Sequence, residues 1–172
     1  DFREHMDVQY SESLPGLRID EAGGKVSFNT TGDLTPALEK FFERYLEKDY
    51  GFFRITEAYA PGFYALLRAL KKMSLSNARY IKGHITGPLT TGVSFKDETG
   101  RDIIHNELFF DAVVKGLAMK AAWQIEELKP FGKPIIIFMD EPAMESLGSA
   151  FSAVSSELVA EKLNEITDTI HE

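Results

Sequence analysis

The chain has 172 residues, of which 44% are hydrophobic and 27% charged, and its formal net charge at pH 7 is −8. This balance is typical of one globular domain, and the acidic charge argues against nucleic acid or an anionic membrane as the main partner, because both attract clustered lysine and arginine. The sequence lacks any apolar run of about 20 residues and any cysteine, so we expect no transmembrane helix, no disulfide and no cysteine-ligated zinc. We therefore expect a cytoplasmic protein.

The first 34 residues predict an accessory helix and hairpin. Residues 1–13 are polar with scattered apolar side chains, which is typical of a short helix, and Leu14-Pro-Gly16 ends it. Two short extended segments, 17–20 and 25–30, flank a turn that contains Gly23 and Gly24. This arrangement predicts a β-hairpin.

Two helices are expected next. Thr35 as N-cap and Pro36 in the first turn open the first, and apolar residues at helical spacing continue to Leu46. Residues 63–72 predict the second helix. The segment 52–59 between them fits either an extended stretch or a helical turn.

Residues 77–86 predict a strand that ends at Gly87-Pro88. Its alternating sets are Arg79, Ile81, Gly83 and Ile85, and Tyr80, Lys82, His84 and Thr86. The first set suits packing under helices, and the second would then point into a barrel interior or a cleft. Residues 89–101 predict a polar loop.

A helix of roughly 25 residues is expected over 102–128. Five apolar residues, Ile135 to Met139, then run without alternation, which is typical of a strand buried on both faces of a parallel sheet. Asp140 and Glu141 follow directly. An unpaired buried carboxylate costs several kcal/mol, more than the roughly 1.5–3 kcal/mol returned by burying one isoleucine. We therefore expect both acids at the carboxyl end of the strand, where α/β proteins bind ligands.

The C-terminal part predicts a serine-rich loop, 144–153, and a last helix capped by Ser155 or Ser156. The order of strand, long helix, strand and helix predicts βαβ units with parallel strands. The sequence lacks an initiator methionine and stops within a helical pattern, so we expect a piece of a longer protein.

Three features are candidate ligand-binding positions, and each has a structural alternative. Asp140 and Glu141 could bind a ligand or simply begin a solvated loop. Gly87-Pro88 could let the backbone approach a ligand or form only a turn. His84, on the same face as Lys82, could bind an anionic group or form a structural salt bridge with Asp140.

Two motifs together resemble a known family. Lys82-Gly-His-Ile-Thr-Gly-Pro-Leu-Thr90 is similar to the strand-loop motif of the family that holds cobalamin-independent methionine synthase, corrinoid-dependent methyltransferases and uroporphyrinogen decarboxylase. Phe138-Met-Asp-Glu-Pro-Ala-Met144 resembles the Asp-Glu-Pro-Ala-Leu motif of the methionine synthase branch. The two motifs also have the family's order and separation, with a long helix between them. The resemblance covers roughly residues 35–172.

That family is a (β/α)₈ barrel with its site at the carboxyl face of the strands. The resemblance therefore implies an α/β fold in which residues 35–172 form part of a TIM barrel, within one domain that also includes the accessory residues 1–34. By resemblance, Asp140 matches the acid that binds the amino group of homocysteine. Gly87, Pro88 and Thr90 match the loop beside the site, and Glu141 belongs to the same motif.

The chain departs from the family in two respects. The charged segment that helps methionine synthases to hold folate reads Glu145-Ser-Leu-Gly148 here. The family's zinc ligands come from strands after the Asp-Glu-Pro strand. A complete barrel has eight strands in about 250 residues, and only two or three of these strands can be recognised in this chain. We therefore expect neither zinc nor activity in this chain, and zinc in the full-length parent.

The leading hypothesis is a parent methyltransferase that transfers a methyl group to a thiol such as homocysteine, with Asp140 positioning that substrate. One alternative is a metal-free decarboxylase of the uroporphyrinogen type, although Arg79, Lys82 and Arg101 are few for a substrate with many carboxylates. Another is a non-catalytic binding or assembly domain. A partial barrel exposes strand edges, so we expect a homo-oligomer.

Overall fold

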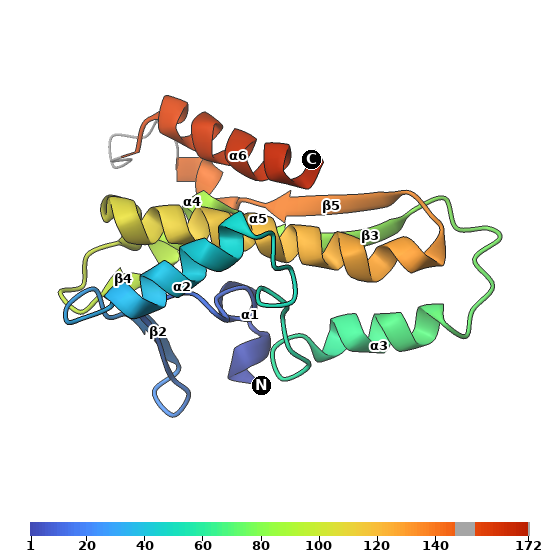
Figure 1. Cartoon of the computed structure of the whole chain (residues 1–172), viewed down its shortest axis with the longest axis horizontal. Helices are drawn as coiled ribbons and strands as arrows, with labels where there is room; N and C mark the ends of the chain where they lie inside the picture. The colour runs from blue at the N-terminus through green and yellow to red at the C-terminus, as the bar shows by residue number, and fades with distance from the viewer. Residues whose placement is uncertain (147–153, 172) are drawn as a thin grey trace.

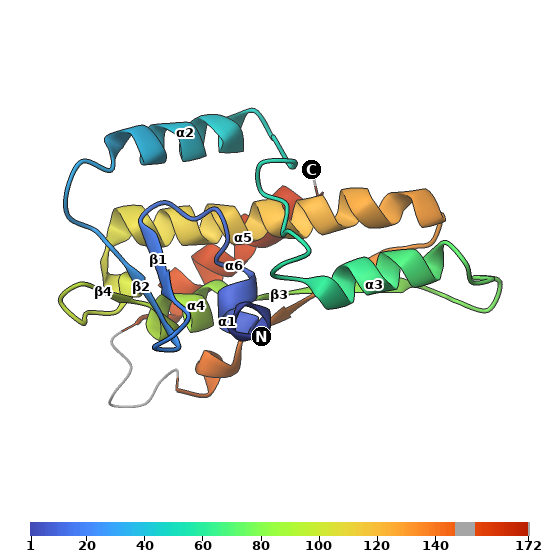
Figure 2. The same cartoon turned by 90° about the horizontal axis from the view of Figure 1, so that it is seen from below.

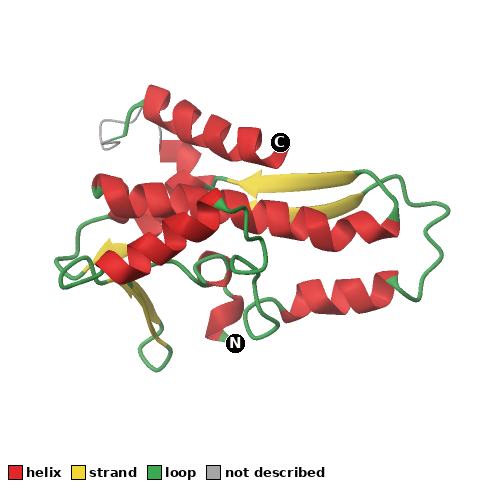
Figure 3. Cartoon of the chain, viewed as in Figure 1, coloured by secondary structure: helices red, strands yellow, loops and turns green. Residues whose placement is uncertain are grey.

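The computed structural model describes residues 1–146 and 154–171. They form a mixed α/β fold with six α-helices and two small sheets, and no closed barrel is present among them (Figures 1 and 3). No helix in this described part is both long and apolar enough to cross a membrane.

The larger sheet contains the predicted hairpin, which is confirmed. Strand β1 (Leu17–Asp20) pairs antiparallel with β2 (Lys25–Phe28), and β4 (Lys96–Asp97) adds a short parallel third strand. The prediction of a loop over 89–101 is wrong, because helix α4 (Pro88–Ser94) occupies its first half. A carboxylate from another segment satisfies the first amides of this helix, and local sequence does not reveal such a contact.

The smaller sheet is the predicted parallel pair. Strand β3 (Ile81–Thr86) pairs in register with β5 (Ile135–Asp140), and the 22-residue helix α5 (Glu107–Leu128) connects them. Helix α6 (Ser156–His171) packs beside α5 (Figure 2). The predicted serine cap is confirmed, since Ser155 Oγ accepts a hydrogen bond of 3.2 Å from the Leu158 amide.

The remaining elements are two helices of 12 and 10 residues, α2 and α3, and several shorter helical segments. They are η1 (Phe2–Glu4), α1 (Met6–Gln9), α2 (Thr35–Leu46), α3 (Pro61–Leu70), η2 (Ile103–His105), η3 (Lys129–Phe131) and η4 (Pro142–Ser146). Thr35 is the first residue of α2, and the N-cap is Leu34, one residue before the predicted cap. The ambiguous segment 52–59 forms turns. The predicted loop 144–153 falls mostly outside the described residues.

The two faces of the β3–β5 pair have different surroundings. Gly83, Ile85 and Ile137 lie on the face that α5 covers, as the alternation in β3 predicts. The opposite face, here called the open face, carries the side chains of Lys82, His84, Thr86, Ile136, Phe138 and Asp140. The prediction that β5 is buried on both faces is wrong, because Phe138 is 48% exposed. An unbroken apolar run does not reveal which face a neighbouring element leaves uncovered.

On the edge of β3 that faces away from β5, a side chain of α5 bonds the backbone of His84. The buried Gln124 donates from Nε2 to the His84 carbonyl at 2.9 Å and accepts at Oε1 from the His84 amide at 3.2 Å. Its amide thus makes the two bonds that a neighbouring strand would make. A Cβ on Gly83 would lie 2.8 Å from the Gln124 oxygen, so glycine leaves room for this contact.

Replacing Gln124 with leucine is expected to lower the free energy of unfolding by about 1–2 kcal/mol, because the His84 amide and carbonyl lose both partners. Urea denaturation measures the loss, and hydrogen exchange of the His84 amide should accelerate in the native state. Unchanged stability together with unchanged exchange would contradict this role for Gln124.

Candidate functional site

The predicted acids lie where the carboxyl ends of β3 and β5 meet. Asp140 is the last residue of β5, and its carbonyl accepts a 2.8 Å hydrogen bond from the amide of Gly87, the residue after β3. Neighbouring strand residues point to opposite faces. Asp140 therefore belongs to the open face, whereas Glu141 turns toward α4.

Glu141 holds the first turn of α4. Its Oε1 accepts from the Leu89 amide at 2.7 Å, and its Oε2 accepts from the Thr90 amide at 2.8 Å and from Thr90 Oγ1 at 2.6 Å. Thr90 Oγ1 in turn accepts from the Ala143 amide at 3.1 Å. The carboxylate therefore joins the segments that follow the two strands, as a capping anion does at a helix N-terminus.

Gly87 and Pro88 build the other half of this contact. A Cβ on Gly87 would lie 2.2 Å from Glu141 carboxyl atoms, so only glycine leaves the cap in place. Pro88 occupies the first helical position of α4, where its missing amide costs nothing, and it is buried. Gly87, Pro88, Thr90 and Glu141 thus form the scaffold of the strand ends.

Asp140 shares the open face with an imidazole and a phenol. The rings of Tyr10 and His84 meet edge to face, with centroids 5.6 Å apart. Burial raises the pKa of Tyr10 above its usual value, and the negative charge of Asp140 raises it further by a smaller amount. Burial lowers the pKa of His84, and Lys82 lowers it further, while Asp140 opposes both effects. We call Asp140, His84 and Tyr10 the Asp140 cluster.

The Asp140 carboxylate makes no hydrogen bond or ion pair with any side chain or backbone group among residues 1–146 and 154–171. The structural salt bridge with His84 is therefore not found there, and the two interact only through their electrostatic field. His84 is neutral at pH 7 and Tyr10 keeps its proton, because of these pKa shifts. Lys82 points its Nζ over the Phe138 ring, 4.0 Å from the centroid. A carboxylate between neutral neighbours suits a cationic group such as an ammonium.

Tyr10 is the member of the cluster that the sequence did not predict. It lies just after α1, and the Thr86 hydroxyl ties this segment to β3 by donating to the Met6 carbonyl at 3.2 Å. No local pattern marks Tyr10, since its neighbours on the open face are more than 70 residues away along the chain.

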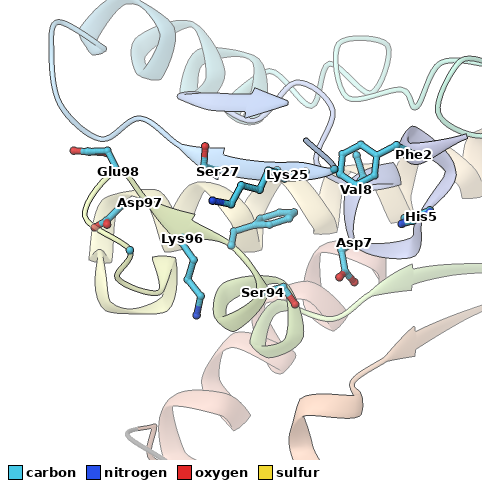
Figure 4. Close-up of a pocket in the computed structure, with 14 residues that line it drawn as sticks. Phe2, His5, Asp7, Val8, Lys25, Ser27, Ser94, Lys96, Asp97 and Glu98 are labelled. Atoms are coloured by element: carbon cyan, nitrogen blue, oxygen red, sulfur yellow. The ribbon is translucent and has the colours of Figure 1, made fainter. Parts of the chain in front are cut away.

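A cavity of about 250 Å³ adjoins the cluster. Tyr10 and His84 form one part of its wall, and Phe63 and Trp123, with ring centroids 5.0 Å apart, form an apolar part. A larger hollow of about 690 Å³ lies elsewhere, between the N-terminal segment, β2 and β4 (Figure 4). It contains no residue of the Asp140 cluster, and its Lys96 is already paired with Asp102.

The described residues do not fit a zinc site. They include no group of three or more histidine, cysteine, aspartate or glutamate side chains that could hold a metal, and the sequence has no cysteine. Asp140 and His84 alone fall short of the three protein ligands usual at catalytic zinc. Residues 145–148 stand where methionine synthases carry the charged segment that helps to hold folate. These residues lie partly outside the described part of the chain.

Comparisons with protein-family models, with curated proteins and with solved structures gave no match to this chain. The site is therefore interpreted from its own geometry, together with the resemblance of its two motifs.

Proposed function

We propose that this chain forms the amino-group-binding part of a methyltransferase that resembles the methionine synthase branch and methylates a thiol such as homocysteine. The observation that carries the proposal is the Asp140 carboxylate. It ends a parallel strand and has no partner in the described chain, and Tyr10 and His84 beside it are neutral at pH 7. The ammonium of an amino acid is the complement of such a carboxylate.

We also propose that β3, α5, β5 and α6 are consecutive units of a partial (β/α)₈ barrel in a cytoplasmic protein. A parallel strand pair with a helix on one face and polar side chains on the other supports this, as does the position of Asp140 at the carboxyl end. The contact between Gly87 and Glu141 supports it further, because both resembling motifs meet there.

In this proposal Asp140 orients the substrate through its ammonium, and the apolar wall formed by Phe63 and Trp123 accepts the substrate's carbon chain. The zinc that would activate the thiol is assigned to the full-length parent, since the described residues offer no site for it. The decarboxylase alternative has less support. Arg79 precedes β3, at the end of the strand opposite Asp140, so cations do not gather at the carboxyl rim.

Homocysteine binding to the chain tests the proposal. We expect homocysteine to shift the NMR signals of the His84 imidazole, and 4-mercaptobutanoate, which lacks the amino group, to bind at least about tenfold more weakly. Asp140→Asn should weaken homocysteine binding by about tenfold, which corresponds to about 1.4 kcal/mol.

Asp168→Asn is the matched control, because it makes the same change on an exposed position of α6. It should bind homocysteine like the unaltered chain. Equal binding of both thiols, or equal binding by Asp140→Asn and Asp168→Asn, would refute the role of Asp140.

A further inference from the structure

One long segment of this acidic chain carries the opposite charge. Residues 58–96 contain six lysines and arginines and no aspartate or glutamate, whereas the whole chain has 27 acidic and 19 basic residues. A cluster of one charge sign gives the surface around it a local potential that differs from that of the whole chain. Where the fold places these cations decides whether they form one surface.

A small apolar cluster draws the carboxyl end of α3 to the amino ends of β3 and β5. Its buried residues are Leu67, Leu70, Ile81 and Leu128, and Leu75, Phe131 and Ile135 pack against them. The Ile81 amide also donates to the Pro134 carbonyl at 3.0 Å. The connections 71–80 and 129–134 therefore meet at one end of the molecule, at the right of Figures 1 and 2.

Four cations at this end have side chains without a hydrogen bond or ion pair among the described residues. Lys71 and Lys72 directly follow α3. Arg79 and Lys133 each stand two residues before the first pair of the β3–β5 ladder. Lys71, Lys72 and Arg79 are exposed, and Lys133 is half-buried. We call these four residues the basic patch. Because like charges repel one another, an anionic partner that contacts all four is favoured.

The charges next to the basic patch do not cancel it. The ion pair of Arg68 with Glu57 adds no net charge. The same holds for the ion pair of Lys129 with Glu126. Glu127, on the last turn of α5, is unpaired among the described residues and offsets one cation. This end of the molecule therefore stays positive, although the net charge of the chain is −8.

The basic patch lies at the end of the strands opposite Asp140. The six residues of β3 span roughly 20 Å, so the patch is separate from the proposed substrate site. Both connections precede their strands, and in the proposed barrel they lie on its amino rim. Further strands would extend this rim sideways without covering it.

An acidic stretch of another protein is the partner that fits the basic patch. Its carboxylates pair with the lysines, and the Arg79 guanidinium can bind one carboxylate through two parallel hydrogen bonds. Met73 and Tyr80, exposed at 62% and 56%, lie in the same connection and offer apolar contact to side chains between the acids. A nucleic acid or an anionic membrane is less suitable, because it extends past four cations and meets the acidic remainder of the chain.

We propose that the basic patch binds a short acidic segment of a partner protein, in which an apolar or aromatic side chain accompanies several carboxylates. The inference is independent of the proposed function, because it involves no residue of the Asp140 cluster. Ion pairs at an exposed surface make such binding weak, rapid and dependent on salt.

Fluorescence anisotropy measures the binding of a labelled peptide in which glutamates surround one phenylalanine and one leucine. We expect a dissociation constant on the order of 10–100 µM at about 0.1 M salt, and at least about tenfold weaker binding when glutamine replaces every glutamate. In NMR spectra the peptide should shift the amide signals of residues 71–80 and 132–133 and leave that of Asp140 unchanged. Equal binding of the two peptides, or shifts confined to other residues, would overturn the proposal. Tighter binding of a single-stranded oligonucleotide or of phosphatidylserine vesicles would also overturn it, in favour of a polyanion.

Charge reversal at two exposed positions locates the site. Lys72→Glu combined with Arg79→Glu should weaken peptide binding at least about tenfold. Neither side chain is bonded in the described chain, so both substitutions should leave the thermal unfolding midpoint unchanged. Arg18→Glu combined with Lys25→Glu is the matched control, because it makes the same charge changes on the exposed hairpin, away from the patch (Figure 1). This control should bind the peptide within about twofold of the unaltered chain, since distant charges are screened. An equal loss in both double variants would show that total charge, and not the basic patch, governs binding.

Discussion

Gly87→Ala is expected to lower the free energy of unfolding by about 2–4 kcal/mol, because the new methyl group displaces the partly buried Glu141 carboxylate from its contacts with α4. The backbone itself tolerates alanine, since Gly87 has φ −77° and ψ 165°. The cost arises at Glu141, whose carboxyl atoms would lie 2.2 Å from the new Cβ. To move away, this carboxylate must give up its three hydrogen bonds to Leu89 and Thr90.

A double-mutant cycle with Glu141→Ala separates the clash from other effects of the substitution. In the Glu141→Ala background the added methyl group meets no carboxylate, so Gly87→Ala should cost less than about 0.5 kcal/mol. Gly62→Ala is the control, because a Cβ there meets no atom within 4 Å. It should leave stability unchanged or raise it. Additive costs for Gly87→Ala and Glu141→Ala in chemical denaturation would show that the two positions are not coupled.

The free energy of unfolding should also depend strongly on pH, because Lys120 on α5 is fully buried. Its Nζ donates to the Glu12 carbonyl at 2.5 Å and to the Phe53 carbonyl at 3.5 Å. Burial lowers the pKa of Lys120 from 10.5 to about 8, although the charge of Glu12 opposes the shift. Between these two pKa values the unfolded chain binds more protons than the folded chain, so stability rises with pH. The gain from pH 8 to pH 10 is about 2 kcal/mol.

Urea denaturation at pH 8, 9 and 10 measures this gain, and Lys120→Met should abolish it. Lys115→Met is the control on the same helix. Burial alone would lower the pKa of Lys115, but hydrogen bonds to Asp111 and Glu165 outweigh it and raise the pKa, so this lysine stays charged in both states throughout the interval. A variant without Lys120 that still gains about 2 kcal/mol over this pH range would assign the effect to another group.

Features that depend on neighbours along the chain could be predicted from the sequence. The hairpin, the long helix α5 and the strand before Asp140 follow from turn residues and apolar runs, and the structure contains all three. The alternation in residues 81–86 also indicated correctly that His84 lies on the face away from the covering helix.

Contacts between distant segments could not be predicted in this way. Helix α4 was expected to be a loop, because the carboxylate that caps it comes from Glu141, about 50 residues later. The exposure of Phe138 also escaped prediction, because an apolar run is compatible with one covered face or two.

The sequence by itself determined the local elements and the placement of Asp140 at the end of a strand, since backbone preferences and the cost of burying a carboxylate act over a few residues. Only the tertiary structure decided the surroundings of that acid. It brought Tyr10 from the N-terminal segment against His84 and turned Glu141 into a helix cap. These features depend on which distant groups meet when the apolar faces pack together, and no short stretch of sequence records that.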